Sequence, residues 1–142
     1  MPVNLLVVDD ELEIREMLSR HFRFLGYDVD TAENGQDALD KMAERKTDIV
    51  ISDIRMPVMD GPELCKRIRL DFPMTRVIMI TGYVTLENAL ACLRRGADTC
   101  VFKPLEDMTE LEQAVNRSVE MIQTWMKKLT ELRKMKTPSK SS

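Results

Sequence analysis

Several residue patterns are missing from this chain of 142 residues, and each absence removes a class of protein. Its three cysteines lack CxxC spacing and lie among apolar neighbours, so we expect neither a zinc site nor a disulfide framework. No apolar run approaches membrane-spanning length, and no basic segment precedes the short apolar run near the N-terminus, as a signal peptide would require. These absences favour a cytoplasmic protein without membrane contact.

An excess of positive charge is lacking as well. The chain has 21 Lys and Arg against 24 Asp and Glu, and its formal net charge of -3 offers no electrostatic footprint for direct nucleic-acid contact. His21 is the only histidine, and its place beside an apolar helical stripe indicates a packing or surface role rather than phosphohistidine transfer. The length suits one domain with a substantial core.

Short apolar runs alternate with helical patterns along the chain. Runs rich in Val and Ile are typical of strands buried on both faces, and they cover residues 5–8, 48–52, 76–81 and 99–102, with a weaker run at 27–32. Apolar residues at helical spacing follow each run, and Gly26 and Gly96 stand where two of these helices would end. Five strand–helix repeats predict an α/β fold: a flavodoxin-like, doubly wound (βα)5 sandwich with a parallel five-stranded sheet in the order 2-1-3-4-5.

Polar residues stand where these predicted strands end. Asp9 and Asp10 follow the first strand, Asp53 ends the third, Thr81 ends the fourth and Lys103 ends the fifth. In a doubly wound sheet such positions share one rim, next to the switch point between strands 1 and 3. Paired carboxylates beside an apolar edge require positive charge, and Mg²⁺ takes oxygen ligands of this kind. An aspartate, an ammonium and a hydroxyl around a metal favour phosphoryl transfer to a carboxylate.

Each of these features also has an ordinary structural explanation. The acidic pair fits a solvated loop, Thr81 fits the end of a strand and Lys103 fits a surface lysine. The functional interpretation depends on their joint occurrence at the same strand ends.

Four stretches resemble the receiver domains of bacterial two-component response regulators over about residues 3–122: VVDDE at 7–11, DIRMPVMDG at 53–61, MITGY at 79–83 and VFKP at 101–104. The resemblance implies a phosphorylation-dependent switch that accepts a phosphoryl group on Asp53 from a histidine kinase or a histidine phosphotransfer protein. It also implies a metal site for Mg²⁺ or Mn²⁺, made by Asp9, Asp10, Asp53 and the backbone carbonyl of Arg55. Such a domain is no enzyme apart from its own phosphotransfer and autodephosphorylation.

The resemblance assigns further roles and has one departure. Thr81 and Lys103 would contact the phosphoryl oxygens, and a cis peptide at Lys103–Pro104 would aim the lysine. Gly61 would provide a turn of positive φ before the third helix. The family often has Tyr or Phe three residues before the lysine, but this chain has Cys100 there, so the usual aromatic switch is absent. We expect Tyr83 to lie partly exposed beside the phosphorylation pocket.

Two other function classes fit part of the pattern. A haloacid-dehalogenase-like phosphatase shares the aspartyl nucleophile, Mg²⁺, hydroxyl and lysine, but it requires an acidic residue two places after the nucleophile. Arg55 holds that place after Asp53, and Leu12 holds it after Asp10. A nucleotide- or flavin-binding module would have a glycine-rich loop after the first strand, where this chain is acidic.

The last helix is too long for a minimal receiver. It opens with TELE at 109–112, a capping-box pattern, and runs without Gly or Pro to about Met135, roughly 40 Å. We divide the chain into a receiver domain at 1–122, a helical extension at 123–135 and a disordered tail or linker at 136–142. Val115, Ser118, Ile122, Trp125, Leu129 and Leu132 alternate steps of three and four, which indicates a heptad seam for a homodimer or an output module. A stand-alone receiver and the receiver of a larger regulator or hybrid kinase both fit.

Overall fold

Five parallel strands form one sheet in the order β2-β1-β3-β4-β5, which confirms the predicted topology. The computed structural model describes residues 2–82 and 85–135. The strands are β1 Asn4–Val8, β2 Asp28–Ala32, β3 Ile49–Asp53, β4 Arg76–Thr81 and β5 Thr99–Phe102. The helices are α1 Leu12–Phe24, α2 Gly35–Glu44, α3 Gly61–Asp71, α4 Leu86–Arg94 and α5 Thr109–Lys134. The expectations for Tyr83 and for the tail at 136–142 lie outside the described residues.

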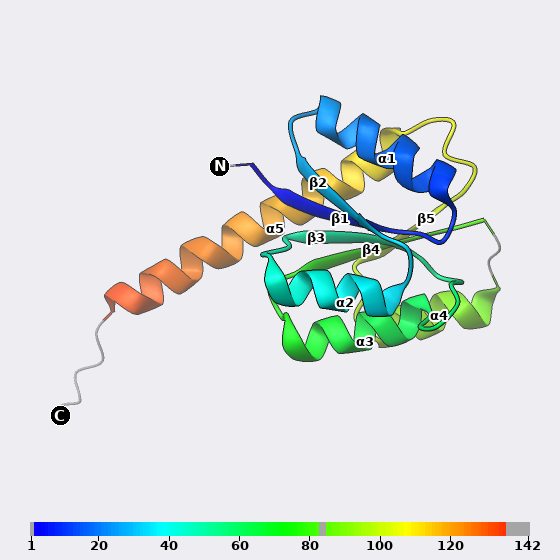
Figure 1. Ribbon diagram of the computed structural model, residues 1–142. Coiled ribbons are helices and arrows are strands. Elements are labelled where there is room, and N and C mark those ends of the chain that lie inside the picture. The colour runs from blue at the N-terminus through cyan, green and yellow to red at the C-terminus, as the bar shows by residue number, and fades with distance from the viewer. Residues whose placement is uncertain (1, 83–84, 136–142) are drawn as a thin grey trace.

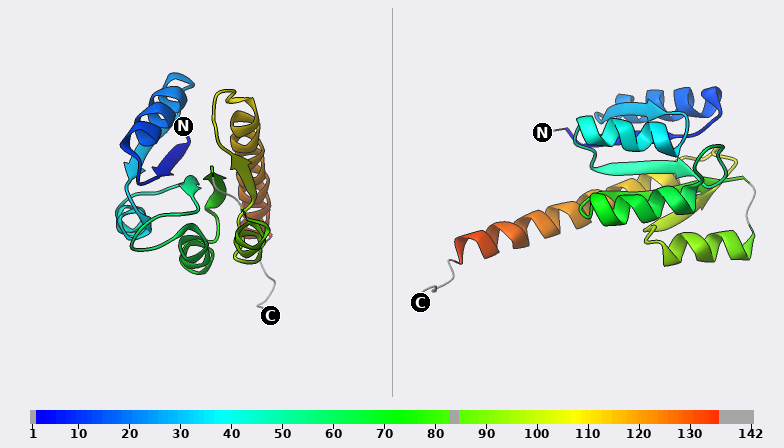
Figure 2. Two further views of the ribbon diagram at one scale, coloured as in Figure 1. Left: turned by 90° about the vertical axis from the view of Figure 1, so that its right-hand side faces the viewer. Right: turned by 60° about the horizontal axis from the view of Figure 1, so that its bottom comes forward.

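The sheet is covered on both faces because its strands carry apolar side chains on both sides. Helices α1 and α5 cover one face, and α2, α3 and α4 cover the other (Figures 1 and 2). The α1/α5 layer packs around Phe22, Leu18 and Leu111, whereas the opposite layer packs around Leu64, Ile68 and Met42. This two-sided burial explains why the strands read as continuous apolar runs rather than alternating ones.

Local sequence sets several of the helix ends. The side chains of Asn34, Asp60 and Thr85 accept hydrogen bonds from the first turns of α2, α3 and α4. Gly26 and Gly96, just past α1 and α4, both have φ of 100°, a backbone conformation that favours glycine.

The start of α5 differs from the predicted capping box. Thr109 is the first residue of the helix rather than its cap, and Met108 precedes it without a side-chain capping bond. The carboxylate of Asp107 instead accepts a hydrogen bond from the backbone N–H of Thr109, at 2.9 Å. The side chain of Asp107 therefore takes the capping role that the pattern predicted for Thr109.

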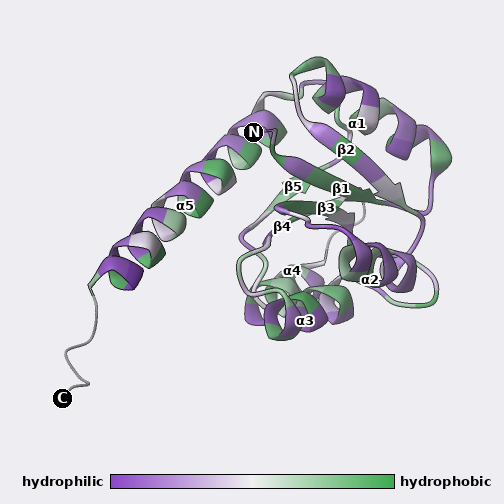
Figure 3. Ribbon diagram, turned by 60° about the vertical axis from the view of Figure 1, so that its left-hand side comes forward, coloured by the Kyte–Doolittle hydropathy of each residue, from purple (hydrophilic) through white to green (hydrophobic). Residues whose placement is uncertain are grey.

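Helix α5 runs beyond the sheet that its first turns cover (Figure 1). Leu111, Ala114, Val115 and Ser118 are buried, and Ile122 still packs against the α1/α5 layer. Hydrophobic residues recur along the projecting part of the helix (Figure 3), where the Trp125 residue is 47% exposed and Leu132 62%. Within residues 2–82 and 85–135, no helix is both long and apolar enough to cross a membrane.

Candidate functional site

The carboxyl ends of β1, β3, β4 and β5 bring the predicted polar residues to one rim. Strand register fixes this arrangement: Val8 pairs with Ser52, and Thr81 pairs with Phe102. Asp9 and Lys103 therefore follow directly after paired strand ends, and Asp53 is the last residue of β3. A backbone hydrogen bond of 2.8 Å from the N–H of Lys103 to the carbonyl of Thr81 ties the last two strands together at this point.

Lys103 is the centre of the charge cluster. Its Nζ lies 3.2 Å from Oδ2 of Asp9, 3.2 Å from Oδ2 of Asp53 and 3.4 Å from Oε1 of Glu11. Burial by itself would lower the pKa of Lys103, but the negative charges of Asp9 and Asp53 outweigh it, and the net shift of the pKa is upward. The ammonium therefore stays protonated across the physiological pH range.

Asp9, Asp10 and Asp53 form the acidic part of the site. Their carboxylate oxygens lie within 4.8 Å of one another. Asp9 has no exposed surface, and burial raises the pKa of its carboxyl, although the backbone N–H of Glu11 and the ammonium of Lys103 oppose the shift. Asp10 is exposed at the solvent side. Three carboxylate oxygens at this spacing, two of them on buried residues, fit a hard divalent cation such as Mg²⁺.

The loop after Asp53 is held close to the strand end. The backbone N–H of Gly61 donates to the carbonyl of Ile54 at 2.7 Å, and the N–H of Arg55 reaches Oδ1 of Asp53 at 3.4 Å. A Cβ atom on Gly61 would lie 2.8 Å from the backbone oxygen of Asp53. The expectation of positive φ at Gly61 is wrong: Val58, with φ of 73°, has the left-handed conformation in this loop. The lack of a side chain at Gly61 instead allows its backbone to lie close to that of Asp53.

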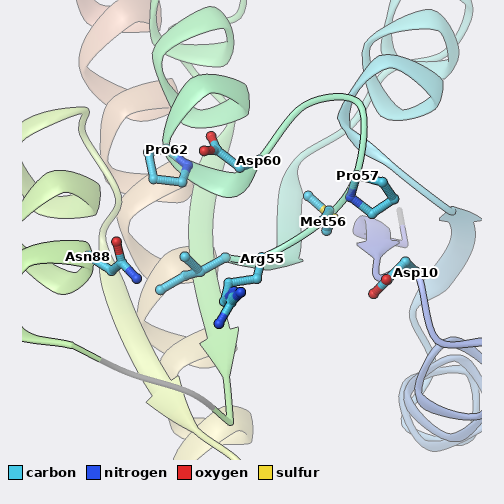
Figure 4. Close-up of a pocket in the computed structure, with 8 residues that line it drawn as sticks. Asp10, Arg55, Met56, Pro57, Asp60, Pro62 and Asn88 are labelled. Atoms are coloured by element: carbon cyan, nitrogen blue, oxygen red, sulfur yellow. The ribbon is translucent and has the colours of Figure 1, made fainter.

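An open cleft continues outward from the acidic residues. Asp10 stands on one side of it, Asn88 at the start of α4 on the other, and Arg55 between them (Figure 4). Pro57, Asp60 and Pro62 complete much of the remaining wall. The cleft leaves room for a group bound at the rim to extend toward the solvent.

Two further expectations concern the last strand. The Lys103–Pro104 peptide is cis, as the resemblance implied. Cys100 lies opposite Met79 and packs against the α2/α3/α4 layer, so it is part of that core. Phe102 is the residue opposite Thr81, and its side chain is 57% exposed.

Sequence reasoning missed two residues of this site. The sequence pattern assigns no role to Glu11, but its carboxylate contacts Lys103. Asn88 carries no recognisable motif, and only the fold brings it to the cleft. The adjacency of Glu11 to the acidic pair was the one available signal.

Comparison with known proteins identifies the family. The response regulator receiver domain matches residues 5–116, most of the chain. The chain belongs to this family. Receiver domains are the phosphorylation-dependent switches of two-component systems, and the fold, the rim and the acidic cluster agree with that assignment.

This chain covers a different share of each of its relatives. The regulatory protein AtoC of Escherichia coli is 41% identical over 117 residues, 82% of this chain and 25% of AtoC. TrrA of Thermotoga maritima, solved in complex with Mg²⁺ and BeF, has a TM-score of 0.74 and 37% identity over 82% of this chain and 98% of that one. NtrX of Brucella abortus has a TM-score of 0.83 and 30% identity over 94% of this chain and 30% of NtrX. The chain thus spans about a quarter of AtoC.

Proposed function

We propose that this receiver accepts a phosphoryl group on Asp53 from the phosphohistidine of a histidine kinase or a histidine phosphotransfer protein. The observation that carries the proposal is the position of the Asp53 carboxylate, which shares Lys103 with Asp9 at a rim open to the cleft. The site differs from a phosphatase of the haloacid-dehalogenase type because no acidic residue stands two places after Asp53. We infer that autodephosphorylation is the only further reaction.

The chemistry follows from groups that the rim brings together. A carboxylate oxygen of Asp53 forms a bond to phosphorus while the bond from phosphorus to the donor nitrogen breaks, and its electron pair leaves with the imidazole. The ammonium of Lys103 balances charge on the phosphoryl oxygens, because it already lies within 3.2 Å of Asp53. Thr81, only 1% exposed at the end of β4, offers its hydroxyl from the neighbouring strand.

A divalent metal completes the proposed site. Asp9, Asp10, Asp53 and the backbone carbonyl of Arg55 would hold Mg²⁺ or Mn²⁺, which supplies positive charge to the phosphoryl group when bound. The close carboxylate oxygens support this assignment. The complex of the related TrrA with Mg²⁺ supports it as well.

Phosphorylation by a small phosphodonor tests the proposal directly. Incubation with acetyl phosphate and Mg²⁺ should add one phosphoryl group, which intact-protein mass spectrometry detects and peptide mapping places on Asp53. Asp53→Asn should abolish the addition, because the amide is not a nucleophile, and circular dichroism should show an unchanged fold. Asp48→Asn is a matched control, since Asp48 lies at the opposite end of the sheet, beside the start of β3. Undiminished phosphorylation of Asp53→Asn would contradict the assignment.

We also propose a role for the extension of α5. Residues 123–135 extend the helix beyond the receiver at 1–122 and form a two-stranded seam with a second copy. Exposed Trp125, Leu129 and Leu132 continue the heptad positions that Val115 and Ser118 occupy inside the domain, which supports this division. The chain covers only 30% of the longer NtrX, which supports a further module in a protein of this kind.

A further inference from the structure

We propose that Glu11 is a charge gate for phosphorylation: its carboxylate restrains Lys103 and opposes the approach of anionic phosphodonors. The inference rests on the proposed function of Asp53. It assigns Glu11 the role of a positioning residue that sets the rate of the reaction without taking part in bond formation.

The contact between Glu11 and Lys103 differs from the other two contacts of the lysine. The side chains of Asp9 and Asp53 are 0% and 10% exposed, whereas that of Glu11 is 64% exposed. Lys103 itself is 14% exposed. Glu11 therefore contacts the ammonium from the solvent side, while the two aspartates contact it from within the site.

Backbone geometry holds Glu11 in this place. Glu11 precedes α1 with an extended backbone, φ -92° and ψ 117°, and its N–H donates to Oδ1 of Asp9 at 2.9 Å. Its carbonyl accepts the N–H of Arg15 at 3.1 Å, the first bond of the helix. Because hydrogen bonds hold both the N–H and the carbonyl of Glu11, its side chain starts from a fixed backbone position next to the mouth of the site.

The charge balance gives the gate its effect. The carboxylates of Asp9, Glu11 and Asp53 contact the ammonium of Lys103. The carboxylate of Asp10 lies close to those of Asp9 and Asp53 and adds a fourth negative charge. Even with a divalent cation bound, this set has a net negative charge, and an incoming phosphoryl group adds more. A phosphoryl group on Asp53 competes for the ammonium of Lys103 with Glu11, the most exposed of the three partners of the lysine. Both effects slow phosphorylation, and both disappear when Glu11 loses its charge.

Three variants separate the charge of Glu11 from its shape. Glu11→Gln keeps the size and removes the charge, whereas Glu11→Asp keeps the charge. Glu13→Gln is the matched control, because Glu13 is an exposed acidic residue in the first turn of α1, two positions away. Rates are measured at saturating Mg²⁺ with acetyl phosphate, a dianion, and with phosphoramidate, which carries less negative charge.

We expect Glu11→Gln to be phosphorylated by acetyl phosphate about three- to tenfold faster than the wild type, as removal of one charge near the site predicts. The gain should be smaller with phosphoramidate, and Glu11→Asp and Glu13→Gln should stay near the wild-type rate. The proposal would be overturned by any one of three results. Glu11→Gln could react at the wild-type rate, Glu11→Asp could be accelerated as much as Glu11→Gln, or the acceleration of Glu11→Gln could be equal with both donors. Peptide mapping of the phosphorylated wild type separates a failure of this proposal from a failure of the proposed function. If the wild type is not labelled on Asp53, the proposed function itself is refuted.

Discussion

The Nζ atom of Lys103 lies 3.2 Å from Oδ2 of Asp9, a residue with no exposed surface. Burial disfavours the charged form of Asp9, because it raises the pKa of this carboxyl even with the half-buried Lys103 beside it. The fold therefore keeps a carboxylate where its charged form is disfavoured. Such a placement suits a group whose natural counter-charge is a metal.

The first prediction is that Asp9→Asn stabilises the protein in the absence of divalent metal. We expect the free energy of unfolding at pH 7.5 to rise by about 1–2 kcal/mol. The unfolded carboxyl titrates near 3.8 and the folded one at higher pH, so the cost of ionising Asp9 is absent below pH 3.8 and complete above the folded pKa. The stabilisation should thus grow as pH rises through this window.

Urea denaturation in EDTA across pH measures this difference, with the exposed Asp10→Asn as the control. Addition of Mg²⁺ should stabilise the wild type but not Asp9→Asn. A less stable Asp9→Asn at pH 7.5 in EDTA would show that the contact with Lys103 outweighs burial.

The second prediction concerns close packing at Gly61. Gly61→Ala would place a Cβ 2.8 Å from the backbone oxygen of Asp53 and 2.8 Å from Cα of Ile54, so the loop after β3 has to move. We expect a loss of about 2–4 kcal/mol of stability and slower phosphorylation of Asp53.

Gly26→Ala provides the contrast for this variant. Gly26 has φ of 100° but no atom within 4 Å of an added Cβ, so only backbone strain of about 1 kcal/mol is expected. Thermal denaturation ranks the two variants, and equal losses would argue against the steric role of Gly61.

The third prediction is that the cysteines are unreactive in the folded protein. Burial raises the pKa of Cys65 to about 11 and that of Cys92 to about 12, and it also raises the pKa of the half-buried Cys100. At pH 8 the thiolate fraction of Cys65 is about one in a thousand. A chromogenic disulfide reagent should label no cysteine within minutes under native conditions and all three in guanidinium. Rapid labelling of one thiol in the folded state would contradict this interpretation.

The extent of prediction from sequence differs between the fold and the site. Continuous apolar runs alternating with helical patterns predicted the doubly wound sheet, and the flavodoxin-like strand order predicted that Asp9, Asp53 and Lys103 lie at one rim. The role of Gly61 was not predictable, because it depends on the distance to Asp53 across a loop. The contact of Glu11 depends on the side-chain conformation of Lys103, which no local pattern encodes.

The last prediction concerns the extension of α5 and its heptad positions. Ile122, Trp125, Leu129 and Leu132 occupy the seam, so a parallel pair of helices would bury these side chains between two copies. In that register Lys128 lies opposite Arg133 of the other copy, and the two positive charges repel. The apolar seam therefore favours a dimer, and the repulsion between the flanking positive charges weakens it.

Sedimentation equilibrium tests this arrangement with one change of charge. We expect the wild type to associate more tightly at 0.5 M than at 0.05 M salt, because salt screens the repulsion. Lys128→Glu should tighten the dimer by about two- to tenfold at low salt, since each side of the seam then carries a pair of opposite charges. Lys127→Glu is the matched control, because Lys127 lies on the side away from the seam. A chain ending at Glu120 should stay monomeric. If Lys127→Glu and Lys128→Glu associate equally, or if the full chain is monomeric at every salt concentration, the extension does not form this parallel seam.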